Sequence, residues 1–340
     1  MDGTYRPDLS QTMDQKGLDV IPLALALGKP GVGLLHDEMP SHAAVVALNT
    51  AFVTDGAVVR IAQGAQLAKP LLLIFARSGG EGHLVTTRNI VTVGVDAKAC
   101  VVEAHVVVKG AAPGEDNTLT DITVGEGAHL SHVKVALAGS GDTHHLATGI
   151  VKLNASSVYR GFQVTADTAF ARNTTFVSYA GEDAKADISG VFLGRGGETI
   201  DTTLLIDHTV PGCESRELFK GVLDENARGV FQGKVIVRQA AQKTDGKQMA
   251  QAMMLSPNAE FDSKPELEIY ADDVACGHGS TAAELDTDML FYLRARGIPL
   301  PEARALLIES FAAAALEKIA DEPLREAMRA VALGWLGAAT

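Results

Sequence analysis

The chain of 340 residues has few cysteines and few aromatic residues. Its three cysteines, Cys100, Cys213 and Cys276, are widely separated in the sequence. This separation excludes a CxxC motif for zinc or a cluster, and three thiols do not make a complete disulfide framework. Reduced thiols in a cytoplasmic protein are therefore expected. Aromatic residues make up 5% of the chain, with one tryptophan, so large aromatic stacking platforms are not expected.

Positive charge is also scarce, with 29 Lys and Arg against 42 Asp and Glu and a net charge of −13. This balance disfavours binding to phosphate backbones or anionic lipid. The opening residues lack the basic region of a signal peptide, and the apolar run from Val20 to Gly28 contains Pro22 and is too short to span a membrane. We therefore expect no nucleic-acid partner and no membrane partner.

The common catalytic motifs are missing. The sequence contains no GxSxG, HExxH or dinucleotide-binding motif. The glycine-rich segment Gly194-Arg195-Gly196-Gly197 lacks the GK[ST] residues and the helix that follow in a phosphate-binding P-loop. We interpret this segment as a turn between strands, and we do not expect the chain itself to be an ATPase.

What the sequence does contain is a series of short β-branched runs from about Ala44 to Tyr270, with almost no helical periodicity. Alanines recur in the turn clusters between these runs, at similar intervals apart from one long interval between the fourth and the fifth: Ala99, Ala128, Ala155, Ala184, Ala227 and Ala259. A loose repeat of strands without helices is typical of a stacked β-solenoid. A β-propeller is the alternative, but its four-stranded blades need a longer period.

After Thr281 the periodicity becomes helical. A short stripe ends at Gly297-Ile298-Pro299, and Pro301 stands where a first-turn proline belongs. The apolar faces expected for the helices are Leu285, Met289 and Tyr292, then Leu307, Phe311, Ala315 and Ile319, and finally Leu324, Met328, Val331 and Trp335. We therefore divide the chain into a short N-terminal segment (1–41), a β-solenoid core (42–285) and a small helical domain (286–340).

The most unusual stretch lies where the core meets the helices. Cys276 and His278 are two positions apart, so in a strand their side chains share a face, and thiolate and imidazole both bind borderline metals. Two ligands do not complete a site, and from spacing alone a structural cysteine and a turn histidine are favoured. The same interpretation applies to His208 and Cys213. Further histidines, interpreted as surface or core residues, are His129, His132, His144 and His145.

Longer motifs around these residues resemble the SufB/SufD family of iron–sulfur cluster assembly proteins. The C-terminal signature is similar in residues 254–298, which include Lys264-Pro265-Glu266-Leu267-Glu268-Ile269-Tyr270, Cys276-Gly277-His278-Gly279-Ser280-Thr281 and Leu290-Phe291-Tyr292-Leu293-Arg294-Ala295-Arg296-Gly297. Shorter similar segments are residues 47–52, 207–215 and 229–234. The resemblance covers roughly residues 42–337, and the Gly-Ser-Thr after His278 is more similar to the SufD branch than to SufB.

The resemblance implies a mainly β fold, a right-handed parallel β-helix with a C-terminal helical domain, in agreement with the repeats. It also implies a non-catalytic scaffold subunit that pairs with SufB through its core and holds the ATPase SufC through its helices. His278, with Cys276 beside it, would lie at the SufB interface where a nascent cluster forms. Expected contacts of SufC are Tyr292, Arg294 and Arg296.

The isolated chain is expected to bind no cofactor, because its thiols cannot hold a cluster alone. The iron–sulfur cluster would be transient in the complex, and the type of cluster and the binding of a flavin to the complex stay open. Because a β-helix exposes unpaired strand edges, we expect a homodimer when SufB is absent. The longer N-terminal helical region of the family, with its Arg/Glu/Trp/Tyr motif, is not found in residues 1–41.

Two enzyme classes are alternatives. A β-helix carbohydrate-active enzyme would need paired carboxylates, but Asp272 and Asp273 are neighbours that point to opposite faces of a strand. A Cys–His hydrolase built on Cys276 and His278 lacks an orienting third residue. A scaffold function is therefore the leading interpretation.

Overall fold

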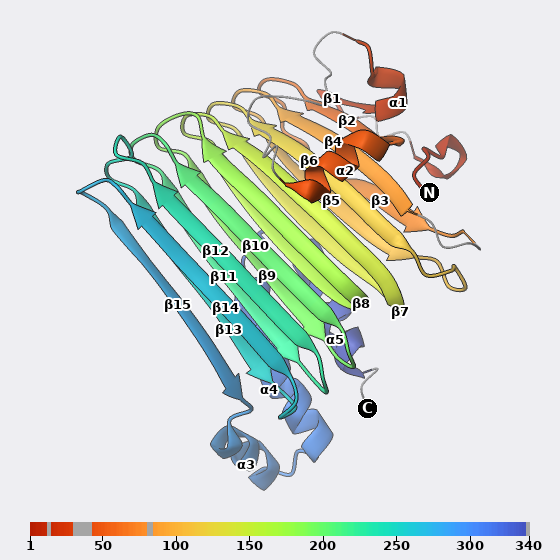
Figure 1. Cartoon of the computed structure of the whole chain (residues 1–340), viewed down its shortest axis with the longest axis vertical. Helices are drawn as coiled ribbons and strands as arrows, with labels where there is room; N and C mark the ends of the chain where they lie inside the picture. Colours follow the sequence, from red (N-terminus) through yellow and green to blue (C-terminus); the bar gives the residue numbers. More distant parts are fainter. Residues whose placement is uncertain (12–14, 30–42, 80–83, 338–340) are drawn as a thin grey trace.

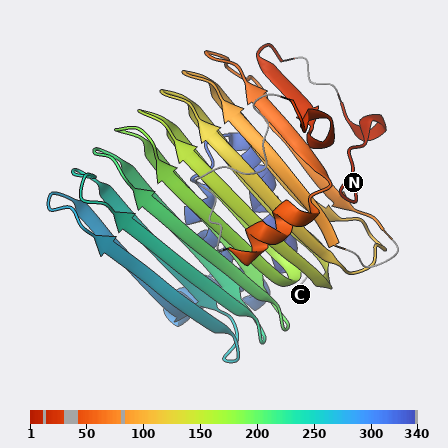
Figure 2. The ribbon, with the colours of Figure 1, turned by 45° about the horizontal axis from the view of Figure 1, so that its top comes forward.

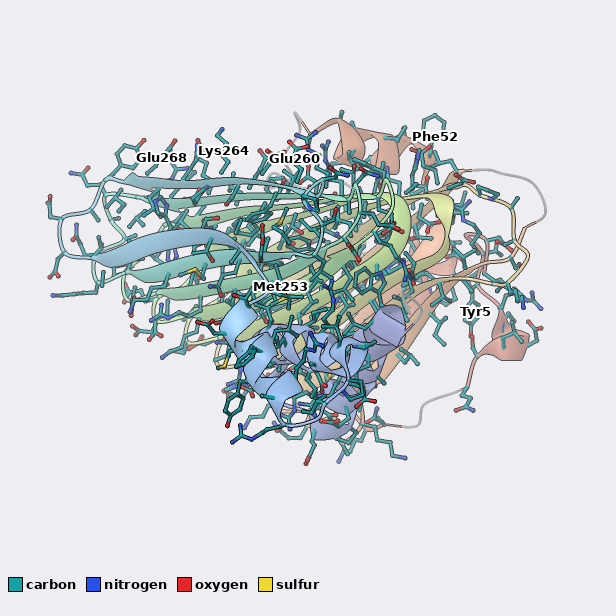
Figure 3. The ribbon with its side chains drawn as sticks, turned by 90° about the horizontal axis from the view of Figure 1, so that it is seen from below. Tyr5, Phe52, Met253, Glu260, Lys264 and Glu268 are labelled. Atoms are coloured by element: carbon teal, nitrogen blue, oxygen red, sulfur yellow. The ribbon has the colours of Figure 1, made fainter. Side chains whose placement is uncertain are left out.

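The structure is a computed structural model that describes residues 1–11, 15–29, 43–79 and 84–337. Its core is a parallel β-solenoid of about eight turns, which agrees with the prediction and excludes the propeller alternative. Each turn contributes one strand to an upper sheet and one to a lower sheet, the two layers seen in Figure 3. The turns differ in length, since the paired residues His144 and Phe170 are closer in sequence than the paired residues Arg228 and Glu260.

The strands of the two sheets alternate along the chain (Figure 1). The upper sheet contains β2 (Asp55–Ile61), β4 (Leu84–Val93), β6 (Glu115–Val124), β10 (Thr199–His208), β12 (Arg228–Val237) and β14 (Glu260–Ile269). The lower sheet contains β3 (Leu71–Arg77), β5 (Lys98–Val107), β9 (Lys185–Gly194), β11 (Glu214–Leu223), β13 (Asp245–Met254) and β15 (Ala275–Glu284). The long strands β7 (His129–Leu153) and β8 (Val158–Tyr179) contribute a half to each sheet.

The core fills the space between the two sheets. Side chains alternate along each strand, so one set faces inward and the other faces out. On β9, Ala186, Ile188 and Phe192 belong to the interior cluster, whereas Val191 and Leu193 belong to a second cluster on the outer surface. This regular alternation fixes which side chains can meet inside the solenoid.

Helices cover the outer surface of both sheets. Figure 2 shows α2 (Ala44–Phe52) on one side of the strands and the C-terminal helices on the other. Val46 of α2 packs on Leu119 and Ile150 of the upper sheet. On the lower sheet, α4 (Leu300–Leu316) and α5 (Glu322–Gly337) bury an apolar cluster, whereas α3 (Thr287–Ala295) buries no residue.

The N-terminal residues lie at the first turn of the solenoid. They form η1 (Pro7–Leu9), β1 (Leu18–Pro22) and α1 (Leu23–Ala26), and β1 pairs antiparallel with β2. Asp2 also accepts hydrogen bonds from Ser78 at the end of β3. The predicted boundary between residues 41 and 42 lies outside the described residues.

Some details of the expected secondary structure are wrong, among them the apolar face expected for α3, since Met289 and Tyr292 are exposed. Residues 44–52, placed in the series of strands, form α2, because their apolar residues serve one helix face that packs on the upper sheet. Of the apolar face expected for the helix that follows α3, Ala315 and Ile319 are buried as predicted, whereas Leu307 and Phe311 are only half-buried. The other buried residues of α4 are Ala303, Ile308, Ala312 and Leu316. The face predicted for α5 is correct, since Met328 and Trp335 are buried.

Candidate functional site at the open end of the solenoid

The last turn of the solenoid leaves both of its strands unpaired on one side. In the part of the chain that the structure describes, β14 pairs with β12 alone and β15 with β13 alone. Most side chains of β15 are exposed. Unpaired backbone N–H and C=O groups on such an edge can pair with a strand of another chain.

Cys276 and His278 both lie on β15 at this end. Cys276 is paired in register with Gly246 and packs against the interior cluster, and His278 is paired with Gln248. Both neighbours on β13 are buried and belong to the inward-facing set. The two side chains therefore share the inward-facing side of the last turn, with Cys276 half-buried and His278 exposed.

Burial raises the pKa of the Cys276 thiol above its usual range. The thiol is thus protonated at neutral pH, which makes it a weak nucleophile and counts against the Cys–His hydrolase alternative. Among the described residues, no group of three or more His, Cys, Asp or Glu side chains could hold a metal ion. A metal held at the open end by a full set of protein ligands would need ligands from a second chain.

Directly beneath His278, the interior contains a column of polar side chains. Glu217 on β11, Gln248 on β13 and His278 on β15 occupy the same position in successive turns. Glu217 and Gln248 are 2% and 3% exposed, and neither side chain has a hydrogen-bond partner at normal geometry. Burial raises the pKa of Glu217 to about 8, and Ser215 only partly opposes this shift, so the carboxyl is largely neutral at pH 7.

This column was not apparent from the sequence. In β11 the inward residues Ser215 and Glu217 alternate with Arg216 and Leu218, so both faces of the strand contain a charged residue. Only the register against Gln248 and His278 shows that Glu217, and not Arg216, faces the interior. If the repeat had a regular period, the sequence alone would have aligned the Glu217 carboxyl with His278.

The second histidine and cysteine pair is structural, as interpreted from the sequence. The His208 ring stacks on Tyr179 with 4.3 Å between centroids, and its Nε2 lies 3.1 Å from the Ser215 hydroxyl. Burial lowers the pKa of His208 to about 4 and raises that of Cys213 to about 11. Both groups are therefore uncharged core residues at neutral pH.

A second polar cluster lies in the first half of the interior. The Glu103 carboxylate is 3.0 Å from His132 Nε2 and 3.6 Å from His105 Nε2, and these contacts lower its pKa despite complete burial. His145 is likewise buried, while His129 and His144 are partly or fully exposed, so these histidines are the core and surface residues expected. A cavity of about 40 Å³ lined by Glu103 and His132 has room for water.

The glycine-rich segment at residues 194–197 is the predicted turn between β9 and β10. Arg195 has a role that the motif alone did not indicate. Its guanidinium lies 2.8 Å from Asp167, stacks 5.1 Å from the Trp335 ring centre and donates to the Trp335 carbonyl. Arg195 therefore fixes the end of α5 on the lower sheet.

The residues predicted to contact SufC lie on α3 and just after it. Phe291 and Tyr292 are 74% and 53% exposed, and Arg294 is also exposed. The Arg296 guanidinium stacks on the Tyr292 ring at 3.8 Å from its centre. Asp286 caps the helix by accepting from the N–H groups of Asp288 and Met289. A well-formed helix thus presents aromatic and basic side chains away from the core.

Asp272 and Asp273 form no catalytic pair. They lie in a bend before β15, and not in a strand as expected, and both are exposed. Asp273 forms an ion pair with Lys243. The carboxylates offered for the carbohydrate-active alternative are therefore surface charges.

The outer surface of the last turn is charged. Glu260, Lys264 and Glu268 project from β14 away from the lower sheet (Figure 3). Lys234 on the preceding strand lies 2.6 Å from Glu268. No helix in the described part of the chain is both long enough and apolar enough to cross a membrane.

Comparison with known proteins agrees with this geometry. Residues 75–311 match the family model for the SufBD core domain of SUF system FeS cluster assembly. The iron–sulfur cluster assembly protein SufD of Escherichia coli is 32% identical over 329 residues, which covers 96% of this chain and 76% of that protein. A SufBD family protein of Synechocystis is 31% identical, covering 94% and 73% of the two chains. SufD of Bacillus subtilis is 26% identical, covering 84% and 65%.

Proposed function

Because this chain belongs to the SufBD family and so has a role in iron–sulfur cluster assembly, we propose that it is a non-catalytic scaffold subunit of an ATPase-driven assembly complex. The open end of the solenoid carries this proposal. Two strands there, β14 and β15, have an unpaired edge, and β15 carries the inward-facing Cys276 and His278. These two side chains do not complete a metal site within the described part of the chain. Such a half-site suits a subunit whose partner supplies the remaining ligands.

The partner at the open end is SufB. A second β-solenoid docked on β14 and β15 would satisfy their backbone groups and close the interior from solvent. His278 is the ligand that this chain contributes to the nascent cluster, with Cys276 beside it. The cluster is cargo of the complex, and the isolated chain binds no cofactor.

The ATPase SufC binds α3 and the start of α4. The support for this proposal is that α3 is capped, exposed and buries no residue, so it has no role in packing its own core. Tyr292, Arg294 and Arg296 are the proposed contacts. Without SufB, the open ends of two copies pair and give a homodimer. We place the assembly in the cytoplasm, in keeping with three cysteines that are all free thiols.

The test is the variant His278→Ala, co-expressed with SufB and SufC. His278 is exposed, so folding and assembly should persist. The iron content of the purified complex should fall at least about tenfold, since loss of even an outer contact of a ligand has that effect on metal affinity. Cys276→Ser should have a smaller effect, because a partner can supply a thiolate.

Thermal denaturation of the same complexes distinguishes ligand loss from a structural defect. If His278 only bonds to a nearby carbonyl, its loss should reduce stability by about 1 kcal/mol and spare iron loading. A lowered melting temperature with normal iron content would therefore overturn the proposed role of His278.

A further inference from the structure

The interior column beneath His278 contains buried polar atoms that the proposed function does not yet use. Both oxygens of Glu217 and both polar atoms of the Gln248 amide are buried without a hydrogen-bond partner at normal geometry. Leaving such a group unpaired in the interior is destabilising, because its hydrogen bonds to water have been lost without replacement. Of these two side chains, Gln248 lies nearer the open end, so its amide is the one that a group approaching from that end can reach.

The Gln248 amide lies inside the solenoid. The amide crosses the interior to the upper sheet, where a Cβ on Gly233 would lie 2.1 Å from Nε2 and 2.5 Å from Oε1. Only a glycine at position 233 leaves this space free. The Gln248 amide therefore occupies the interior close to Gly233, one turn below the open end.

His278 is the polar side chain placed to complete the column. It is paired in register with Gln248, and neighbouring strands lie about 4.8 Å apart, so the two side chains leave adjacent backbone positions on the same face. A histidine that binds a metal through one ring nitrogen donates its other N–H to a fixed acceptor, which sets the tautomer and orientation of the ring. Gln248 Oε1 is an acceptor without a partner in this position.

We propose that Gln248 is a positioning residue for His278: its Oε1 accepts the N–H of one ring nitrogen, its Nε2 donates to Glu217, and the other ring nitrogen faces the open end. This inference rests on the proposed function, in which His278 binds iron. It adds that the chain presents the imidazole in one tautomer and orientation. Glu217 supports the amide from the turn below, and a carboxyl oxygen accepts whether or not the group is ionised.

The tautomer of His278 is the direct test. In the full-length chain labelled with ¹⁵N-histidine, long-range ¹H–¹⁵N correlation reports the tautomer of each ring, and His278→Ala identifies the signals of His278. The wild type should show one tautomer. Gln248→Met has a similar length without the polar atoms, and it should give the mixture typical of an unconstrained imidazole.

Two further variants make the test specific. Gly233→Ala should displace the Gln248 amide and give the same mixture, even if Gln248→Met does not fold. Cys276→Ser, on the same strand as His278, should leave the tautomer unchanged. An unaltered His278 tautomer in Gln248→Met or in Gly233→Ala would overturn the positioning role.

Iron binding separates this inference from the proposed function. In the complex with SufB and SufC, Fe²⁺ titrated against a competing chelator should bind roughly 10–100-fold more weakly to Gln248→Met than to wild type. Normal iron affinity in His278→Ala would contradict the proposed function, while the tautomer measurement would still decide the contact with Gln248. Loss of iron in His278→Ala with unchanged affinity in Gln248→Met would contradict the positioning role alone.

Discussion

Buried histidines make the stability of the solenoid sensitive to acid. His208 is fully buried, and its pKa falls from 6.5 to about 4 in the folded chain. Below pH 6.5 the unfolded chain therefore takes up a proton that the folded chain does not. The free energy of unfolding is therefore unaffected by the protonation of His208 above pH 6.5, and it decreases as the pH falls from 6.5 towards 4.

Urea unfolding at pH 7.5 and pH 5 measures this effect. Between these two values, His208 alone should reduce the free energy of unfolding by about 2 kcal/mol. His208→Phe should retain the stacking on Tyr179 and remove that share of the pH dependence. His144→Phe, at an exposed position, is the control and should leave the dependence intact. An equal loss of stability at pH 5 in wild type and His208→Phe would show that His208 does not titrate as described.

The turns that join one sheet to the other are here called corners. The sequence predicted the type of residue at these corners better than its position. The residue just before each of the lower-sheet strands β5, β7, β8, β9, β11 and β13 is small or medium-sized and buried: Ala97, Ala128, Ser157, Ala184, Cys213 and Thr244. Ala227 and Ala259 precede upper-sheet strands and belong to the opposite corner. The long interval between Ala184 and Ala227 therefore joins two corners, which is why the repeat appeared irregular.

The candidate site was only half predictable for a related reason. Cys276 and His278 are near each other in the sequence and belong to a long motif, so both were found. Gln248 lies one turn before His278 and Glu217 lies two turns before it, and turns of unequal length do not show that the three share a column. Because a shift of one residue moves a side chain to the other face, register must be known before such a column can be seen.

Among the elements, α3 differs from the other two C-terminal helices. α4 and α5 bury Ile308, Leu316, Met328 and Trp335 against the lower sheet, whereas α3 buries nothing. Removing residues 286–340 would expose that apolar sheet surface, so the binding of SufC is better tested by substitutions on α3. Helical periodicity predicted three helices, but the sequence alone could not show which one lacks packing contacts.

Tyr292→Ala and Arg294→Ala should each weaken SufC binding without changing the stability of this chain. Aromatic and arginine side chains are enriched among the hot spots of interfaces, and loss of a hot-spot side chain costs about 2 kcal/mol or more, roughly a thirtyfold change in affinity. Affinity for purified SufC and the melting temperature of the variant chain measure the two effects. Leu333→Ala, at a partly exposed position on α5, is the control and should bind normally. Full affinity in both α3 variants would place the SufC contact elsewhere.

As a whole, the solenoid has two unlike ends. At the first turn, β1 pairs with β2, and Asp2 bonds to the end of β3. At the last turn, β14 and β15 have no such cover in the described part of the chain. In a solenoid each turn buries its interior side chains against the next turn. The last turn has no next turn to cover it, so it favours association with another chain. The molecule therefore has one end suited to a partner.

This asymmetry predicts the state of the chain when it is alone. Light scattering at micromolar concentration should give twice the mass of 35.6 kDa, because two open ends can pair about a two-fold axis. Ser280→Lys places a positive charge on the exposed edge strand β15, where lysine opposes pairing with another strand, so this variant should be a monomer. Gln239→Lys adds the same charge at an exposed corner and should remain a dimer. A monomeric wild type, or a dimeric Ser280→Lys, would show that the open end is not the surface through which copies of this chain associate.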